Sequence, residues 1–454
     1  MKALGALAVA LSIACMTSNR PALHGRCPAT PPGGLLVKAS PDGRFLTDQH
    51  GVPFLIAGDA GWSLIAQLSD QDADAYLANR CDKGFTAVVV SLIEHKFAAR
   101  APADIYGLPP FSGRPFATPN EDYFRHADYI IQDAANRGIV VLLDPLYLGY
   151  DCGDQGWCRE VQAASPADIA AWGEYVGNRY KSYDNIIWVI GGDMDPSPVR
   201  AQMQTFVSAL GSVDTRHLMT AHNVRGQMAV TPWPGATWLT LNAIYTGDSA
   251  TYEPALTAYH VSPALPFFLI EHHFEGESNI SAQQLRSQSY YTVLAGGTGG
   301  SVFGDCPVWG FGARTLTDFC ASTDWKSAME RQGSINMTYF HRLFASRHFH
   351  LLVPDESHTV VTTGYGTPGL LNMVMTAAAS DHSSIIAYVP GPTSITVDPS
   401  TLQASTLNGW WYNPSNGTVT SLGALPAVTR SFTTPGPGDW VLVLDNPTFG
   451  FGPP

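Results

Sequence analysis

The sequence has 454 residues, of which 45% are hydrophobic and 14% charged, so the chain can bury a large core and is not disordered. Its formal net charge is −13 at pH 7, and an acidic surface repels phosphate backbones, which argues against nucleic-acid binding. Aromatic residues make up 11%, which favours neutral, ring-shaped ligands.

Residues 1–26 have the pattern of an export signal peptide followed by the start of a linker. Lys2 provides a positive charge, and the apolar stretch Ala3–Ile13 is too short to span a membrane as a helix. A buried helix at the mature N-terminus is the alternative. Cys15 follows a stretch similar to a lipoprotein cleavage box, so both a lipid anchor at Cys15 and free secretion stay open. No other apolar run reaches the ~18 residues of a membrane span. We therefore expect a secreted, periplasmic or cell-surface protein that is not an integral membrane protein.

The cysteines suit an exported chain. Without Cys15, six cysteines remain, an even number that allows three disulfides. Proximity along the chain favours the pairs Cys152–Cys158 and Cys306–Cys320, which leaves Cys27–Cys81. The rival interpretation is a zinc site, but the sequence has no Cys-x-x-Cys spacing.

After a Pro- and Gly-rich linker over residues 19–34, a hairpin is predicted from Leu35–Ala39 and Arg44–Thr47. Eight short apolar runs then alternate with segments of helical periodicity, as in a parallel sheet covered on both faces. The predicted strands are Phe54–Gly58, Ala87–Leu92, Ile139–Asp144, Ile186–Gly191, His217–Ala221, Trp238–Leu241, Phe267–Ile270 and Gly300–Phe303. The clearest predicted helices are Asp70–Lys83, Tyr123–Arg137 and Ala167–Tyr180.

This alternation over residues 35–350 predicts an α/β fold, a (β/α)8 TIM barrel. A doubly wound open sheet is the competitor, although no Gly-x-Gly-x-x-Gly follows the first strand. Helical periodicity ends near residue 351, and residues 351–454 predict a small antiparallel β-sandwich. Its predicted strands are Thr359–Thr362, Leu370–Thr376, Ile385–Val389, Trp410–Tyr412 and Trp440–Leu444.

In such barrels the working residues lie at the carboxyl ends of the strands. The residues that follow the apolar runs are mostly carboxylates, histidines and aromatic residues, a combination that suits glycoside hydrolysis. That reaction needs one protonated carboxyl and one ionised carboxylate, and aromatic rings bind sugar faces. We predict Asp193 and Glu271 as the catalytic pair, because strands four and seven face each other across the barrel. The predicted substrate-binding residues are Asp59, Trp62, Glu94, His95, Tyr147, His222, Asn223, Tyr245, His272 and Trp309.

Each of these residues also has a structural interpretation. Asp193 could cap a turn, Glu271 could pair with an arginine, and Asp59 could hold the loop after strand one. Asp144 precedes a proline and reads as structural. A metal site at the His272-His273 segment is disfavoured, since no His-Glu-x-x-His motif occurs, and the absence of Gly-x-Ser-x-Gly argues against a serine esterase. We predict no metal and no organic cofactor.

Several segments resemble the apiosidase-like proteins of glycoside hydrolase family 140 over roughly residues 36–447. These segments include Gly58-Asp59-Ala60-Gly61-Trp62, Pro119-Asn120-Glu121-Asp122-Tyr123-Phe124, Asn185-Ile186-Ile187-Trp188-Val189-Ile190-Gly191-Gly192-Asp193 and Asp439-Trp440-Val441-Leu442-Val443-Leu444. The resemblance implies a barrel followed by a collagen-binding-type module, with Asp193 as acid/base and Glu271 as nucleophile. Departures occur beside the expected pocket, where this chain has Ala60-Gly61, His272 and Phe274.

The sequence therefore predicts a glycosidase that removes a terminal pentofuranosyl residue, such as apiose or arabinofuranose, from a polysaccharide, with retention of configuration. The alternative is a carbohydrate- or matrix-binding surface protein built on an inactive barrel. For the β-sandwich, a bracing role is preferred over ligand binding. The sequence does not determine the oligomeric state.

Overall fold

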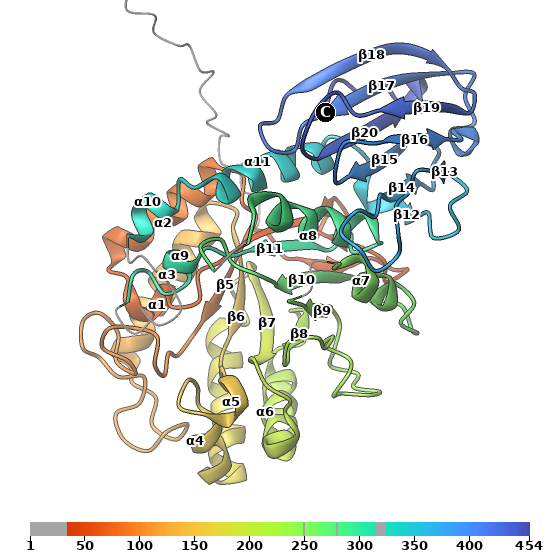
Figure 1. Ribbon diagram of the computed structural model, residues 1–454. Helices are drawn as coiled ribbons and strands as arrows, with labels where there is room; N and C mark the ends of the chain where they lie inside the picture. Colours follow the sequence, from red (N-terminus) through yellow and green to blue (C-terminus); the bar gives the residue numbers. More distant parts are fainter. Residues whose placement is uncertain (1–33, 248–249, 278–279, 314–323) are drawn as a thin grey trace, which may run out of the picture.

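The computed structural model describes residues 34–247, 250–277, 280–313 and 324–454 (Figure 1). The predicted signal peptide, with Cys15, and the two cysteines Cys27 and Cys320 lie outside the described residues.

Eight parallel strands form one sheet in the order β8-β7-β6-β5-β4-β11-β10-β9. The two strands at the ends of this order, β8 and β9, approach each other where the Thr240 backbone N–H donates to the Met219 carbonyl oxygen over 3.0 Å, so the barrel is nearly closed. The strands are β4 (Ile56–Ala60), β5 (Ala87–Ser91), β6 (Val140–Asp144), β7 (Ile186–Gly191), β8 (Met219–His222), β9 (Asn242–Tyr245), β10 (Phe267–Glu271) and β11 (Gly300–Phe303). The predicted (β/α)8 fold is confirmed.

The barrel strands form where the sequence predicts them because their apolar, β-branched runs are buried on both faces, as covered parallel sheets require. Every residue of β5 and β7 is buried. One predicted strand is wrong: Trp238–Leu241 is loop, and the sixth barrel strand runs over Asn242–Tyr245. The Trp238 ring packs edge-to-face on Trp233 at 5.4 Å, so it is covered without belonging to a strand.

Helices cover the outside of the barrel (Figure 1). They are α1 (Leu64–Gln67), α2 (Asp70–Asp82), α3 (Glu121–Asn136), α4 (Cys158–Ala163), α5 (Pro166–Tyr180), α6 (Arg200–Val213), α7 (Tyr252–Tyr259), α8 (Ala282–Leu294), α9 (Cys306–Trp309), α10 (Trp325–Ala328) and α11 (Gln332–Ala345). The three clearest predictions correspond to α2, α3 and α5. Each begins after a capping side chain, Ser69, Asn120 or Ser165, that accepts a backbone N–H of the first turn.

A small antiparallel sheet precedes the barrel, in the order β1-β2-β3. Its strands are β1 (Lys38–Ala39), β2 (Leu46–Thr47) and β3 (Pro53–Phe54). The predicted hairpin is β1 and β2, paired through Ala39 and Leu46.

The C-terminal region is an antiparallel sandwich, as predicted. One sheet has the order β12-β14-β15-β20-β17-β18, and the other has the order β13-β16-β19. The strands are β12 (Leu352–Pro354), β13 (Val361–Thr363), β14 (Met375–Ala379), β15 (Ser384–Val389), β16 (Ser394–Val397), β17 (Thr406–Tyr412), β18 (Val419–Pro426), β19 (Arg430–Thr433) and β20 (Trp440–Asp445). Side chains of both sheets, among them Ile395, Trp411 and Leu442, form the apolar core between them.

The sandwich packs on α8 and α11 of the barrel (Figure 1). The ring of Tyr290 on α8 stacks on Tyr388 of β15 at a centroid distance of 5.1 Å. The guanidinium of Arg286 lies 2.6 Å from the carboxylate of Asp439, and both side chains are almost fully buried. One apolar cluster runs from barrel strands into β14, β15 and β20. Among the described residues, no helix has the length and apolar character that a membrane crossing needs.

Candidate active site

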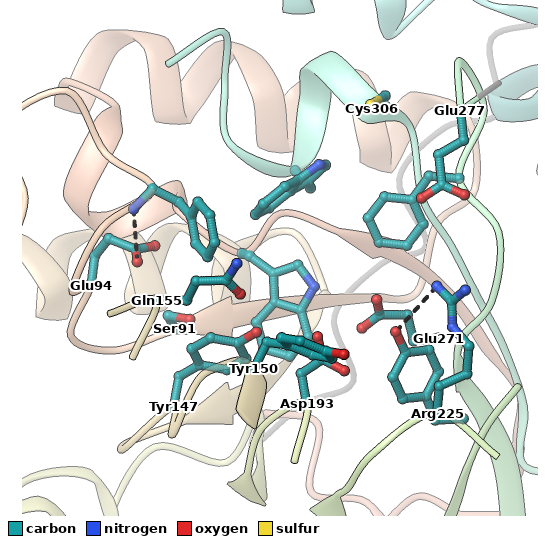
Figure 2. A pocket seen from close by; sticks show the side chains of 15 residues that line it. Ser91, Glu94, Tyr147, Tyr150, Gln155, Asp193, Arg225, Glu271, Glu277 and Cys306 are labelled. Carbon is teal, nitrogen blue, oxygen red and sulfur yellow. Dashed lines mark hydrogen bonds between the residues drawn. The ribbon is translucent and has the colours of Figure 1, made fainter. Parts of the chain in front are cut away.

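A cavity of about 400 Å³ lies at the carboxyl ends of the barrel strands. Figure 2 shows the side chains of Asp193 and Glu271 pointing into this common space. The lining residues are Trp62, Ser91, Glu94, Phe97, Tyr147, Tyr150, Gln155, Asp193, Arg225, Tyr245, Glu271, Phe274, Glu277, Cys306 and Trp309.

Asp193 reaches the cavity because of the turn that follows β7. Gly191 and Gly192 have φ angles of +106° and +129°, which side-chain-bearing residues rarely adopt. A Cβ atom on Gly192 would lie 2.3 Å from the ring of Tyr147, so this position also needs glycine for space. Asp193 itself has a φ of +35°. Backbone strain of this kind is typical of functional sites, where the surrounding structure maintains it.

Glu271 is the last residue of β10. The pairing of β10 with β9 shifts register between Leu269 and Glu271. Such irregularities re-aim side chains at the rims of barrels. The Glu271 side chain is 17% exposed, so it is accessible from the cavity while largely shielded from water.

His222, at the end of β8, connects the two carboxylate-bearing residues. The backbone N–H of Asp193 donates to Nδ1 of His222 over 3.0 Å, so Nδ1 is an acceptor and the proton of the neutral ring is on Nε2. His222 Nε2 lies 3.0 Å from Oε2 of Glu271. The His222 ring stacks on Tyr245 at 5.0 Å and contacts Trp62 at 5.4 Å, which fixes its orientation.

The two carboxyl groups have different electrostatic surroundings. The pKa of Asp193 is raised to about 7, first by burial and second by the negative charge of Glu271, while His222, Arg225 and a hydrogen bond with Tyr245 oppose the shift. Asp193 therefore holds a proton at a pH where an ordinary aspartic acid is ionised. A protonated carboxyl beside a charged one is the arrangement that acid–base chemistry at a glycosidic bond needs.

Among the described residues that line the cavity, Arg225 is the one lysine or arginine. Its guanidinium lies over the ring of Tyr245 at 5.4 Å, and Nη2 is 3.4 Å from the Tyr245 hydroxyl oxygen, as the dashed line in Figure 2 marks. The sequence analysis missed Arg225. Its position three residues after His222, in the loop after a predicted strand, was the available signal.

Of the residues predicted from the sequence, seven line the cavity, namely Trp62, Glu94, Tyr147, Asp193, Tyr245, Glu271 and Trp309. The other five do not line it, namely Asp59, His95, His222, Asn223 and His272.

Two of the carboxylates predicted to bind substrate, Asp59 and Glu94, form hydrogen bonds that stabilise the protein around the cavity. Asp59 is fully buried, where its carboxylate accepts from the Tyr76 hydroxyl over 2.7 Å and from Arg80 over 3.1 Å. Glu94 accepts from the Ser63 hydroxyl over 2.7 Å, and its other oxygen accepts backbone N–H groups of the loop that follows β5, including that of Phe97 (Figure 2). The structure thus favours the structural interpretation of Asp59, and Glu94 shapes the cavity wall through this loop.

The remaining three side chains have partners outside the cavity. His95 Nδ1 is 2.9 Å from the Asp154 carbonyl oxygen, so the ring fastens a neighbouring loop. The Asn223 amide donates to the carbonyl oxygen of Met228 over 2.9 Å. His272 is buried, and burial lowers its pKa to about 4. In the part of the chain that the structure describes, no three His, Cys, Asp or Glu side chains are grouped as metal ligands.

Tyr150 and Gln155 line the cavity from a loop closed by the disulfide Cys152–Cys158, which confirms that predicted pair. The disulfide-closed loop was predicted correctly from the sequence, but the sequence did not indicate that this loop forms part of the cavity wall. Cys81 and Cys306 are also disulfide-bonded. Because Cys27 and Cys320 lie outside the described residues, those two pairings stay predictions.

Comparison with known families agrees with this geometry. A family model described as "Apiosidase-like, catalytic domain" matches residues 40–350, and one described as "Putative collagen-binding domain of a collagenase" matches residues 353–445. No curated protein sequence matches the chain.

Solved structures show the same architecture. A glycoside hydrolase structure is similar with a TM-score of 0.80 and 22% identity, covering 92% of this chain and 98% of that chain. A glycoside hydrolase family 5 structure from Bacteroides vulgatus ATCC 8482 is similar with a TM-score of 0.79 and 22% identity, covering 92% of this chain and 94% of that chain. At these identities the likeness establishes the fold of both domains together.

Proposed function

The chain belongs to the family of apiosidase-like catalytic domains, and from that premise we propose that it removes a terminal pentofuranosyl residue, such as apiose or arabinofuranose, from a polysaccharide. At the coarser level it is a glycosidase, an enzyme that hydrolyses O-glycosyl bonds. The observation that carries the hydrolytic chemistry is the pair of carboxyl groups in one cavity, of which Asp193 has a pKa raised to about 7 beside the charge of Glu271. The family match supports the pentofuranosyl substrate.

In the first step, Glu271 attacks the anomeric carbon and forms a covalent bond to the sugar. The bond from the anomeric carbon to the leaving oxygen breaks, and Asp193 gives its proton to that oxygen. His222 Nε2 lies 3.0 Å from Glu271 Oε2 and orients this carboxylate, while its Nδ1 holds the backbone of Asp193.

In the second step, the sugar is released from Glu271. Asp193, now ionised, takes a proton from a water molecule, and the resulting oxygen nucleophile attacks the anomeric carbon. The bond to Glu271 breaks, so both carboxyl groups return to their starting protonation states. Two successive displacements retain the configuration of the sugar. The charge interaction of Glu271 with Asp193 supports the close approach of the two carboxyl groups that a retaining course needs.

The test is hydrolysis of aryl pentofuranosides and of branched pectin fragments by wild type, Asp193→Asn and Glu271→Gln. We expect each variant to lose at least about 10³-fold in kcat, because each lacks one group of a unit that works together. Glu253→Gln, an exposed carboxylate change on α7, is the matched control. Near-wild-type turnover in either active-site variant contradicts the role given to that residue.

We also propose export from the cytoplasm. The N-terminal pattern of residues 1–26 and the disulfide Cys152–Cys158 support it, because disulfides persist mainly in oxidising compartments. Mass spectrometry of the protein isolated from its native cells should find a mature N-terminus within this segment, with lipid on Cys15 if the chain is anchored. An intact Met1 terminus in the cytosolic fraction contradicts export.

A further inference from the structure

We propose that a groove on the barrel, separate from the cavity, binds the polysaccharide chain that carries the sugar to be removed; this inference rests on the proposed function. The groove measures about 770 Å³ and is open to solvent. Its wall includes Arg200, Ala201, Gln204, Trp233, Thr237 and Trp238.

The groove and the cavity are both built from the segments of chain that follow β7 and β8. The segment after β7 brings Asp193 to the cavity and Ser197 to the groove, just before α6. The loop after β8 brings Arg225 to the cavity and Trp238 to the groove. A hydrogen bond of 3.5 Å from the Gln227 amide to Asp195 joins the two loops between these points. The groove therefore starts at Ser197, four residues along the chain from Asp193, and extends along the outside of the barrel towards Trp238.

The arrangement of the strands indicates where the rest of the substrate leaves the cavity. Between β7, which precedes Asp193, and β10, which ends in Glu271, one arc of the barrel holds β8 and β9, and the longer arc holds β6, β5, β4 and β11. Most of the cavity wall, including Trp62, Tyr147 and Trp309, comes from the longer arc. If the terminal sugar is enclosed by the longer arc, the polysaccharide chain attached to it leaves the cavity over the shorter arc. That chain then passes Arg225 and continues towards Trp238.

The tryptophans of the groove form a braced platform. Trp233 is 6% exposed, with the Arg200 guanidinium over its ring at 5.3 Å. The Trp238 ring packs edge-to-face on Trp233 at 5.4 Å and is itself partly exposed. Arg200 also donates to the Ser197 hydroxyl over 3.2 Å and to the Pro232 carbonyl oxygen. A ring fixed in this way loses little conformational entropy when a ligand covers it.

The chemistry of the wall favours a carbohydrate. An aromatic platform binds the C–H face of a sugar ring, while Thr237, Ser197 and Gln204 offer hydroxyl and amide groups for its hydroxyls. In the part of the chain that the structure describes, no carboxylate belongs to the groove lining, and its one cation, Arg200, is already hydrogen-bonded. A single guanidinium on a chain of net charge −13 does not suit a polyanion such as a nucleic acid.

The experiment compares two substrates in two variants. Trp238→Ala removes the platform, and Ala201→Trp fills the groove from an exposed position of α6 without removing any core side chain. We expect both to lower kcat/KM for a neutral branched polysaccharide with terminal pentofuranosyl residues, such as an arabinan, about tenfold, the effect of one stacking contact. Hydrolysis of a 4-nitrophenyl pentofuranoside should be unchanged, since that substrate has no chain to occupy the groove. Tyr129→Ala, an exposed aromatic change on α3, is the control.

Retardation in gels that contain the same neutral polysaccharide gives a second measure, with Glu271→Gln as the inert background. We expect Trp238→Ala and Ala201→Trp to remove the retardation and Tyr129→Ala to keep it.

The groove proposal is overturned if polymer hydrolysis and gel retardation are unchanged in both variants, or if both variants lose the same factor in rate on the polymer and on the aryl substrate. It is likewise overturned if the wild type cleaves only the aryl substrate and is not retarded. It is also overturned if the variants change only the sedimentation coefficient, which would make the groove an interface between copies. A wild type that cleaves neither substrate contradicts the proposed function itself.

Discussion

At the scale of single residues, the protonation of Asp193 is the feature on which the chemistry depends. Burial is the largest cause of its raised pKa, and the charge of Glu271 is the second. The Asp193 carboxyl therefore keeps its proton because its ionised form is unfavourable in these surroundings, and no hydrogen-bond acceptor is needed to hold that proton. The same two causes define the pH range in which Asp193 can serve as an acid.

The first prediction concerns that range. Because the proposed mechanism requires the acid form of Asp193, whose pKa is raised to about 7, kcat/KM should be highest below pH 7 and fall about tenfold per pH unit well above it. The measurement is a pH profile of kcat/KM with a phenyl pentofuranoside, whose poor leaving group needs the proton. A rate that stays constant from pH 6 to about pH 9 would show that Asp193 is not the acid.

The pair Asp193 and Glu271 at strand ends could be predicted from the sequence, whereas some cavity residues on loops could not. Asp193 and Glu271 follow apolar runs whose ends meet at one rim, so their convergence follows from the fold. Arg225 and Tyr150 come to the cavity through loop paths that depend on tertiary contacts. Asp59 was predicted to bind substrate because of its position on the strand, but it does not line the cavity. Its carboxylate instead accepts hydrogen bonds from Arg80 and Tyr76.

At the scale of elements, the turn after β7 is the most constrained piece of the site. Gly192→Ala places a methyl group where the Tyr147 ring lies, at a φ of +129°. We expect kcat to fall at least about 10²-fold, because misplacing a catalytic group by ~1 Å has that effect. The fold should survive, with a loss of stability of about 1–3 kcal/mol from the strained backbone. The measurement is kcat together with Tm. Gly211→Ala on α6 is the control, since nothing lies within 4 Å of its added Cβ. A Gly192→Ala enzyme with wild-type kcat contradicts this requirement.

The loop closed by Cys152–Cys158 leads to a second prediction at this scale. The backbone N–H of Trp157 donates to the Tyr147 carbonyl oxygen over 2.9 Å, and Lys96 Nζ lies 2.8 Å from the Asp154 carboxylate, so the loop is fastened at other points too. Replacing both cysteines with serine should lower the free energy of unfolding by only about 2 kcal/mol, as expected for a short closed loop.

The larger effect of that double variant should be on KM, which we expect to rise several-fold because Tyr150 and Gln155 lose their fixed positions in the wall. Tyr150→Ala should raise KM in the same way without loss of Tm, since this side chain is 58% exposed. Steady-state kinetics on an aryl pentofuranoside decides the point. An unchanged KM in both variants means that the loop does not contact the substrate.

Strands were predicted wrongly from the sequence where the apolar pattern of a segment and the packing of its side chains disagree. The run Trp238–Leu241 is apolar, yet the tryptophan packs on Trp233 in a loop, and β9 begins after it. β18 was missed because most of its residues are exposed, so no apolar run indicates it. The register irregularity that re-aims Glu271 has no sequence signal either.

At the scale of the whole molecule, the sandwich and the barrel share one buried interface. The Arg286–Asp439 ion pair lies within it, and the Tyr388 hydroxyl also donates to Asp439 over 2.9 Å. Asp439→Asn leaves the Arg286 charge buried without its counter-charge. We expect a loss of about 3–5 kcal/mol in the free energy of unfolding, with kcat unchanged at a temperature where the variant is folded.

Lys326→Gln is the control for that change, because it breaks an ion pair with Asp72 whose lysine is 61% exposed, and such pairs contribute about 0–1 kcal/mol. Denaturant unfolding of both variants supplies the comparison. Equal, small losses in the two would mean that the interface does not brace the barrel. Removal of residues 351–454 should then leave Tm unchanged as well, whereas the interface predicts an unstable barrel.

The central claim is that Glu271 attacks the sugar while Asp193 supplies the proton. The most direct measurement is mass spectrometry of the protein after incubation with a 2-deoxy-2-fluoro pentofuranoside that carries a good leaving group, which slows release of a covalent intermediate. We predict one added pentosyl mass, located by peptide mapping on Glu271. An unlabelled protein that converts its substrate to the inverted sugar, or a label on another residue, would contradict the account.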